Sequence, residues 1–153
     1  MEVDLDAIAK GMALAVPYIG HMGIEVTEMS EGAATALLPD RTELHNHVGS
    51  QHAGALFGVA ETASGAAFVG GFAARMGDVT PLARSAQIAF LKVARGPIEA
   101  KAKLGTPAAE ALATLDADGH VDFSVEVEMT DAEGLVVATA RVDWNVRLKS
   151  TES

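Results

Sequence analysis

The sequence predicts an α+β fold in which a curved antiparallel sheet wraps around one long buried helix. Two observations lead to this prediction. Between residues 44 and 74 the only charged side chain is Glu61, and a helix that is apolar on all sides must be buried. Later in the chain, residues 121–129 and 136–148 alternate apolar and polar side chains, as antiparallel strands with one solvated face do. Such a sheet can bury the helix against its apolar face.

The first part of the chain is expected to form a short amphipathic helix followed by a hairpin. The helix covers residues 4–16 and stops before Pro17, because the residue that precedes a proline disfavours the helical conformation. Two strands, 23–29 and 33–38, follow this helix and are joined by the turn Ser30-Glu31-Gly32. We therefore expect two neighbouring antiparallel strands before the long helix.

The central helix is expected within residues 45–75. Ser50 is the predicted N-cap, because a serine oxygen can accept a hydrogen bond from the free N–H groups of the first turn. The helix is then expected to begin near residues 51–53 and to break or fray at Gly70-Gly71. Residues 77–81 are expected to form a loop.

The rest of the chain predicts a meander of three or four strands. The third strand is expected over residues 85–93 and the fourth over residues 98–104. Residues 105–110 are expected to interrupt the fourth strand, which continues over residues 111–115. A turn at residues 116–119 then leads into the two alternating segments described above.

Composition limits the possible functions. The chain has 153 residues and is expected to form a single domain over residues 1–153. Its net charge of −10 argues against nucleic-acid and anionic-lipid partners, which bind basic surfaces. The absence of cysteine excludes disulfides, thiolate zinc sites and cysteine nucleophiles. The acidic N-terminus lacks a signal-peptide pattern, and the long helix lacks aromatic or basic flanks, so we expect a cytoplasmic protein without a membrane span.

At 100° per residue, the central helix has two distinct faces. Glu61 shares one face with three glycines, which we call the glycine face: Gly54, Gly58 and Gly65. The opposite face carries larger apolar groups: Leu56, Val59, Ala63 and Ala67. Because glycine has no side chain, another group can approach the glycine face closely. This face therefore predicts a ligand channel beside Glu61 or tight helix packing across a dimer axis, and both can hold.

The run from Asn46 to Glu61, NHVGSQHAGALFGVAE, resembles the signature of hotdog-fold acyl-CoA thioesterases of the phenylacetate-pathway and 4-hydroxybenzoyl-CoA type. In that family an asparagine is followed six residues later by His-Gly-Gly, and then by an acidic residue on the central helix. Asn46, His52 and Glu61 have matching spacings, although His-Gly-Gly is His52-Ala53-Gly54 here. Residues 87–104 resemble the third and fourth strands of the family. The overall pattern is most similar to a little-characterised branch.

The resemblance implies hydrolysis of an acyl-CoA thioester. Glu61 would act as the general base or as the nucleophile. The N–H groups of Ala53 and Gly54, at the positive end of the helix, would polarise the thioester carbonyl. Asn46 would position the attacking water or the acyl carbonyl. His52 is expected to cap or orient the entrance of the helix.

Further residues are expected to bind the substrate. Gly58 and Gly65 leave room beside the carboxylate, and Thr80 would assist from the neighbouring subunit. Lys92 and Arg95 would pair with the CoA phosphates. The resemblance implies a homodimer or tetramer with the site at the subunit interface. No metal and no cofactor are expected, apart from the CoA that belongs to the substrate.

Other interpretations stay open at this point. Glu61 could be a structural carboxylate bonded to Asn46, His52 or a partner helix, and Asn46 could simply hold its own loop. His45, His47 and His52 could form a zinc site. The protein could also be a non-catalytic acyl or acyl-CoA binding module on the same fold. A hotdog dehydratase or hydratase is a further reading, but those enzymes pair a histidine with an acid differently.

Overall fold

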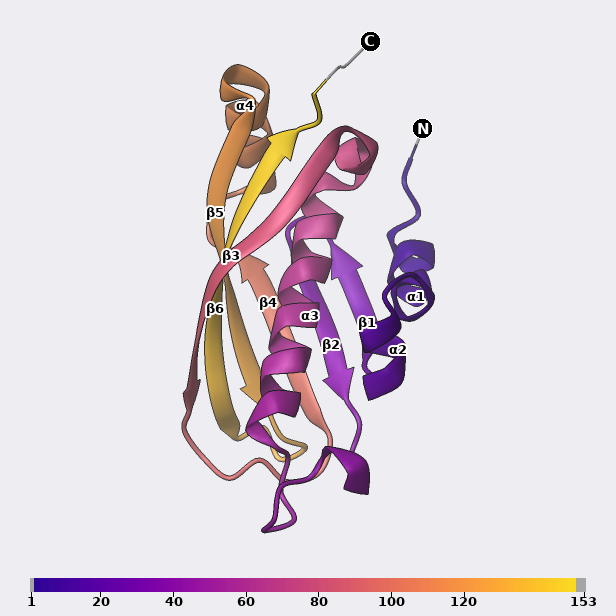
Figure 1. The fold of residues 1–153 in the computed structure, drawn as a ribbon, viewed down its shortest axis with the longest axis vertical. Helices are drawn as coiled ribbons and strands as arrows, with labels where there is room; N and C mark the ends of the chain where they lie inside the picture. The colour runs from indigo at the N-terminus through magenta and orange to yellow at the C-terminus, as the bar shows by residue number, and fades with distance from the viewer. Residues whose placement is uncertain (1, 151–153) are drawn as a thin grey trace.

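The computed structural model describes residues 2–150, and Figure 1 shows one long helix lying against a curved sheet. The elements in chain order are α1 (Leu5–Ala15), α2 (Pro17–Met22), β1 (Glu25–Ser30), β2 (Ala33–Leu38), η1 (Thr42–Leu44), α3 (Ala53–Phe72), η2 (Ala73–Asp78), β3 (Val79–Phe90), β4 (Ile98–Leu104), α4 (Ala108–Asp118), β5 (His120–Thr130) and β6 (Val136–Leu148). α3 is the predicted central helix, and α1 and α2 lie beside β1.

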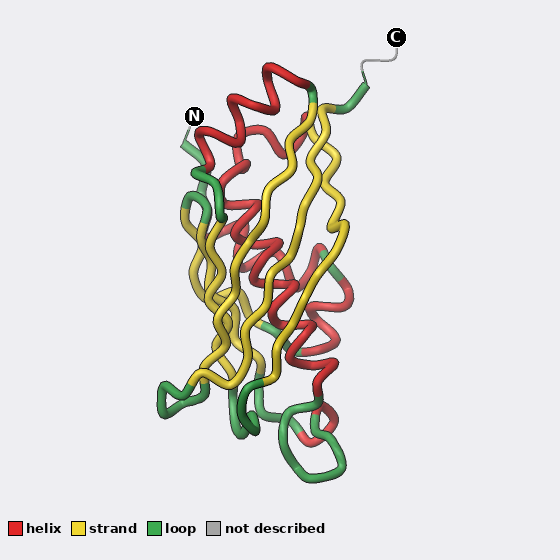
Figure 2. Tube along the Cα trace, turned by 90° about the vertical axis from the view of Figure 1, so that its left-hand side faces the viewer, coloured by secondary structure: helices red, strands yellow, loops and turns green. Residues whose placement is uncertain are grey.

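All six strands belong to one antiparallel sheet in the order β1-β2-β4-β5-β6-β3. β1 and β2 form the predicted hairpin, and β4, β5 and β6 form a meander. β3 follows α3 in sequence but joins the far edge of the sheet beside β6, so it stands outside the meander. Figure 2 shows the sheet curving around the helical layer, which confirms the predicted α+β architecture.

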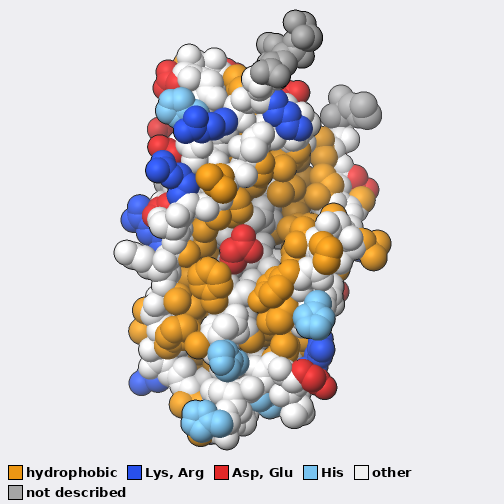
Figure 3. All heavy atoms as spheres, in the orientation of Figure 1, with side chains coloured by type: hydrophobic (Ala, Val, Ile, Leu, Met, Phe, Trp, Pro, Cys, Tyr) orange, Lys and Arg blue, Asp and Glu red, His pale blue; other side chains and the backbone are white. Residues whose placement is uncertain are grey.

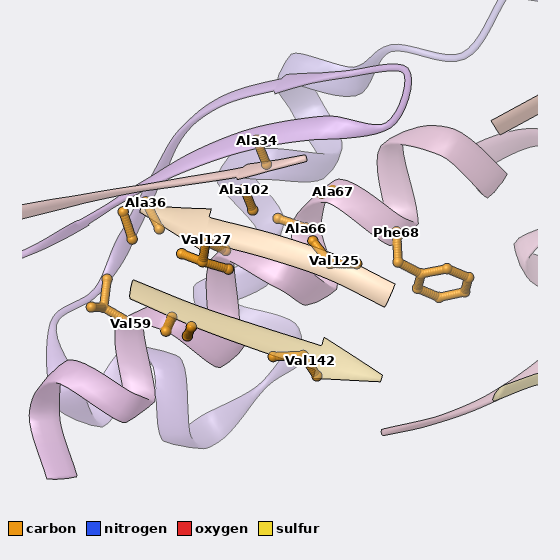
Figure 4. Close-up of a cluster of buried hydrophobic side chains, with 14 of the residues drawn as sticks. Ala34, Ala36, Val59, Ala66, Ala67, Phe68, Ala102, Val125, Val127 and Val142 are labelled. Carbon is orange, nitrogen blue, oxygen red and sulfur yellow. The ribbon is translucent and has the colours of Figure 1, made fainter. Parts of the chain in front are cut away.

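The alanine-rich side of α3 packs onto the middle of the sheet. Ala63, Ala66 and Ala67 are fully buried. They lie near small side chains of β2 and β4, such as Ala36 and Ala102 (Figure 4). Small groups on both surfaces let the helix approach the strands closely at the density of a protein interior. With η2, α3 is long and apolar enough to cross a membrane, but it is mostly buried and is the core helix of the fold.

An aromatic cluster packs the second half of α3 against β5 and β6. Phe68 stacks on Trp144 with ring centroids 5.5 Å apart, and Phe72 lies 5.5 Å from Phe123. All four rings are buried. Aromatic pairs of this kind contribute about 0.5–1.5 kcal/mol beyond the burial of their area. The cluster therefore helps to fix the rotation of α3 about its own axis, and with it the direction of Glu61.

Both predicted ends of α3 need correction. The N-cap is His52 and not Ser50. The helix also continues through Gly70-Gly71 and runs directly into η2 instead of breaking there. A Cβ at Gly70 would lie 2.1 Å from the carbonyl oxygen of Ser30, so the glycine is what allows α3 to touch β1. Gly70 therefore permits close packing of α3 on β1 and does not end the helix.

Two helices differ from the predicted elements. The predicted strand over residues 111–115 is wrong, because this segment belongs to α4. Ala108, Ala111 and Leu115 are its buried residues, at helical spacing, and Gly119 ends the helix with a φ of 79°. α2 was not expected after Pro17, yet a proline fits the first turn of a helix, where its missing N–H would have no partner.

β3 is longer and begins earlier than predicted. It starts at Val79, so most of the predicted loop 77–81 is strand, and it ends at Phe90 instead of residue 93. β3 contains Pro81, and proline cannot donate to a ladder of hydrogen bonds. An edge strand tolerates proline, and β3 is an edge strand.

Replacing Gly70 by alanine is expected to destabilise the fold. The added methyl group would collide with the β1 backbone, and overpacking of this kind costs about 3 kcal/mol. The melting temperature measured by circular dichroism should fall by about 6–12 °C. Gly11→Ala is the matched control, because nothing lies within 4 Å of its Cβ and alanine favours a helix by about 1 kcal/mol. A Gly70→Ala protein as stable as the control would contradict the close contact.

Candidate active site

The start of α3 is capped by a histidine side chain. The Nδ1 atom of His52 accepts a hydrogen bond from the N–H of Gly54 at 2.8 Å, so the predicted capping role of His52 is confirmed. A Cβ on Gly54 would lie 3.1 Å from that nitrogen, closer than an ordinary contact, so glycine suits this position. The N–H of Gly54 is therefore occupied. Within residues 2–150 nothing accepts a hydrogen bond from the N–H of Ala53, and its φ is ordinary.

The side chain of Asn46 organises the loop that leads into α3. Its Nδ2 donates to the hydroxyl of Ser50 at 2.8 Å, and its Oδ1 accepts from the N–H groups of Val48 and Ser50 at 3.0 and 3.1 Å. Asn46 thus holds its own loop, as one of the two readings of the sequence anticipates. In this conformation it fixes where the helix begins.

Gln51, which the sequence analysis did not single out, ties this loop to the segment after β3. Its backbone N–H donates to Ala94, and its side-chain Nε2 donates to the carbonyl oxygens of Pro39 and Gly96 at 3.0 and 2.9 Å. Gln51 is buried, and its Oε1 has no hydrogen-bond partner among the described residues. No local sequence pattern reveals this contact, because its partners are distant in the chain.

A pocket of about 560 Å³ lies beside the helix start, and we call it the helix-start pocket. Six of its residues are Asn46, Gln51, Ala53, Leu56, Phe90 and Lys92. Of the residues predicted to bind the substrate, Lys92 lines this pocket together with Ala53, whose N–H is free. Arg95 is exposed on the same loop, which Gln51 pins against the helix start.

Glu61 lies two turns further along α3. Its side chain is half-buried, and burial raises the pKa of Glu61 above its ordinary value of 4.5. Figure 3 shows an acidic group in the middle of a broad apolar surface on this side of the molecule. Neither Asn46 nor His52 bonds to Glu61, because both are engaged at the helix start. At 1.5 Å per residue, Glu61 and Ala53 are about 12 Å apart along the helix axis.

A second pocket, of about 200 Å³, opens beside Glu61, and we call it the Glu61 pocket. Its lining includes Glu61 and six residues without charge: Met12, Val16, Ile19, Gly65, Phe68 and Trp144. Met12 belongs to α1, Ile19 to α2 and Val16 lies between the two helices, whereas the last two are the stacked rings of the core. The contribution of α1 and α2 is a tertiary contact that no sequence motif marks.

The glycine face does not form one continuous channel in a single chain. A Cβ at Gly58 would lie 2.7 Å from the hydroxyl of Tyr18, so α2 covers this position. Gly54 is held against the ring of His52. Gly65 alone opens into the Glu61 pocket, where a Cβ would lie 3.8 Å from the ring of Trp144.

The remaining candidate residues lie elsewhere. Thr80 pairs with Arg147 on the outer face of the sheet, whereas its neighbour Pro81 lines the Glu61 pocket. The Nε2 atom of His45 lies 2.5 Å from the Oδ1 of Asp40, and His47 is exposed. Over residues 2–150, no group of three or more histidine or acidic side chains is placed to hold a metal ion.

Comparison with known proteins assigns the sequence to a family. Residues 6–146 match the family described as "Domain of unknown function (DUF4442)". The chain belongs to this family. No curated protein matches the sequence.

Solved structures share the fold. A Pseudomonas aeruginosa protein described as a probable thioesterase, PA5026, aligns with a TM-score of 0.85 and 24% identity over 97% of this chain and 99% of that one. The PaaI protein of the Escherichia coli phenylacetic acid degradation operon aligns with a TM-score of 0.73 and 19% identity over 95% and 94%. Thioesterase HI1161 of Haemophilus influenzae aligns with a TM-score of 0.77 and 15% identity, over 100% of this chain and 97% of that one. The hotdog fold expected from the resemblance is confirmed.

Replacing Glu61 by glutamine should change stability in a pH-dependent way. Because burial raises the pKa of Glu61 in the folded state, the folded protein favours the protonated form. The stability that this group contributes is present at low pH and is lost as pH rises through its pKa. Glu61→Gln should therefore melt about 1–2 °C higher than the wild type at pH 8 and equally at pH 4. A variant that is less stable than the wild type at pH 8 would contradict this reasoning.

Proposed function

We propose that this protein hydrolyses acyl-CoA thioesters in the cytoplasm as a homodimer, or as a tetramer built from that dimer. One observation carries the proposal: a half-buried carboxylate, Glu61, lies at an apolar pocket on the helix whose N-terminus presents a free N–H. An apolar pocket suits an acyl group, and a carboxylate of raised pKa suits proton transfer near neutral pH. Thioesterases among the structures with this fold support the same reading.

The chemistry requires a base or nucleophile and a donor for the developing oxyanion. As a base, Glu61 would take a proton from water while the water oxygen bonds to the thioester carbon. The carbonyl oxygen would become an oxyanion, stabilised by the N–H of Ala53 at the positive helix end. Collapse would break the C–S bond, and the thiolate would take up the proton to leave as CoA. As a nucleophile, the carboxylate would instead attack the thioester carbon and expel CoA thiolate as the C–S bond breaks. Water would then cleave the resulting anhydride, releasing the acid and a proton that the thiolate takes up.

The distance along α3 favours a site shared between two subunits. A base and a donor that act on one carbonyl group must both lie within about 3 Å of it. Glu61 and Ala53 of the same chain are about 12 Å apart along the helix, too far for this. Two α3 helices that run antiparallel, with the dimer axis beside Phe57, would bring Ala53 of the partner subunit level with Glu61, because 57 is midway between 53 and 61.

In a single chain, the region around the proposed axis leaves apolar side chains and a strand edge exposed. Phe57, one turn before Glu61, is 42% exposed, and β3 is an open edge strand of 12 residues. Ile88 and Phe90 pair with buried residues of β6, so they face the concave side, yet Phe90 is 52% exposed. A long edge strand with unpaired backbone groups can pair with another chain. A second copy would cover them.

The CoA portion of the substrate fits the helix-start pocket. Lys92 lies at this pocket and Arg95 on the adjoining loop, so both cations can meet the phosphates of CoA. Elsewhere the chain is strongly acidic, with a net charge of −10. We propose that the thioester lies between this pocket of one subunit and the Glu61 pocket of the other.

Glu61→Gln should abolish most of the hydrolysis. Release of free CoA from a panel of short, medium and aromatic acyl-CoAs measures turnover, and loss of a general base lowers kcat/KM by about 10²–10⁴-fold. The wild-type rate should fall as pH drops through the raised pKa of Glu61. Glu110→Gln, on the exposed side of α4, is the matched control and should leave the rate unchanged. Binding of acyl-CoA by the wild type without turnover would support the binding module instead.

Phe57→Cys should form a disulfide between two subunits. The chain has no other cysteine, so one cross-link defines the contact. Cysteines that meet at a twofold axis can reach the Cα separation of 4.4–6.8 Å that a disulfide needs. Non-reducing gel electrophoresis after mild oxidation measures the covalent dimer. Leu14→Cys, 90% exposed on α1, is the control and should stay monomeric on the gel. A wild type that runs as a monomer by light scattering would refute the shared site.

A further inference from the structure

We propose that the Glu61 pocket is the acyl-binding pocket and that it selects thioesters of an aromatic or short-to-medium acyl group, with α1 and α2 as its outer wall. This inference rests on the proposed function, since the acyl group is taken to belong to the substrate of Glu61. It adds the substrate class and the residues that set it. Three observations on the described residues support it: the volume, the nature of the walls and the position of Gly65.

The volume limits the occupant. The pocket holds about 200 Å³. An apolar cavity of about 150 Å³ binds benzene, so this pocket has room for one ring with one or two further carbons, or for a chain of similar size. Only the first part of a palmitoyl chain fits inside it. An acetyl group would leave most of the apolar wall without contact.

The walls have the character of an acyl site. Phe68 and Trp144 form an aromatic floor, stacked at 5.5 Å with an angle of 17° between their planes. Met12 of α1, Ile19 of α2 and Val16 between these helices line the pocket as well. Methionine adapts to irregular apolar ligands, and a flat ring stacks well on aromatic faces. The carboxylate of Glu61 is the charged group among the lining residues, so the reacting carbon lies at that end.

Gly65 sets the free space over the floor. Its Cβ would lie 3.8 Å from two atoms of the Trp144 ring, an ordinary contact distance. A methyl group at this position therefore enters the pocket without a collision. Since alanine and leucine also favour a helix more than glycine does, by about 1 kcal/mol, such variants should fold at least as well as the wild type. Pocket size can thus be changed without loss of stability.

The first test compares substrate preference in a size series. Wild type, Gly65→Ala and Gly65→Leu are assayed with acetyl-CoA, hexanoyl-CoA and phenylacetyl-CoA. The ratio of kcat/KM for hexanoyl-CoA or phenylacetyl-CoA to that for acetyl-CoA should fall progressively, at least tenfold in Gly65→Leu. Gly11→Ala on α1, whose Cβ meets nothing within 4 Å, is the control and should keep the wild-type ratio. Unchanged ratios in folded Gly65 variants would overturn the proposal.

The second test reads binding without catalysis. Trp144 is the only tryptophan of the sequence, so its fluorescence reports on the pocket floor. In Glu61→Gln protein, hexanoyl-CoA and phenylacetyl-CoA should change the emission of Trp144, whereas acetyl-CoA should change it little. The added substitution Gly65→Leu should weaken the larger ligands at least tenfold. An equal response to all three ligands would overturn the proposal.

The two tests separate this inference from the proposed function. If no acyl-CoA is hydrolysed but the larger ligands still bind in a Gly65-dependent way, hydrolysis fails and the acyl pocket holds. If hydrolysis occurs and depends on Glu61, but neither preference nor fluorescence depends on Gly65, the thioesterase stands and the acyl group binds elsewhere. Equal loss of activity on all three substrates in a Gly65 variant that melts like the wild type would likewise refute the pocket.

Discussion

The close packing of α3 on the sheet is the constraint on which the rest of the structure depends. Alanines such as Ala63 and Ala67 let the helix settle onto the middle strands, and Gly70 lets it touch the backbone of β1. When one side of α3 packs on the sheet, the other side faces away from it. That side carries Glu61, which stays half-buried between the two N-terminal helices and the edge strand. The position of the carboxylate thus follows from the close packing of the alanine side of α3 on the sheet.

The same packing leaves the fold incomplete on one side. The sheet is wider than the helix can cover, so Phe90 on the inner face of β3 stays exposed, and so does Phe57 on α3. In the proposed dimer this uncovered region is where the functional parts meet. A free N–H at one end of α3 and a carboxylate two turns away cannot serve one carbonyl group within a chain. In the proposed antiparallel pairing of two α3 helices, the N–H of one subunit lies level with the carboxylate of the other.

The sequence predicts the elements whose signals are local and misses those that depend on tertiary contacts. β2, β4 and β6 match their predicted bounds, because alternation and turn residues mark them. Gly70 was misread as a helix breaker, since a contact with the β1 backbone cannot be seen in one segment. Near the site, the capping role of His52 was predictable from its place at the helix entrance. The clamp formed by Gln51 and the wall formed by Met12 were not, because their partners lie far away in the chain.

The Glu61 pocket joins two kinds of surface that differ in how freely they can change. Its floor is core: Phe68 and Trp144 pack into the aromatic cluster, so altering them would create cavities and cost stability. Its outer wall includes Val16, which lies between α1 and α2 and is 40% exposed. Substitutions there can reshape the pocket at small energetic cost. A scaffold of this kind can keep its carboxylate and helix start fixed while the acyl group that it accepts changes.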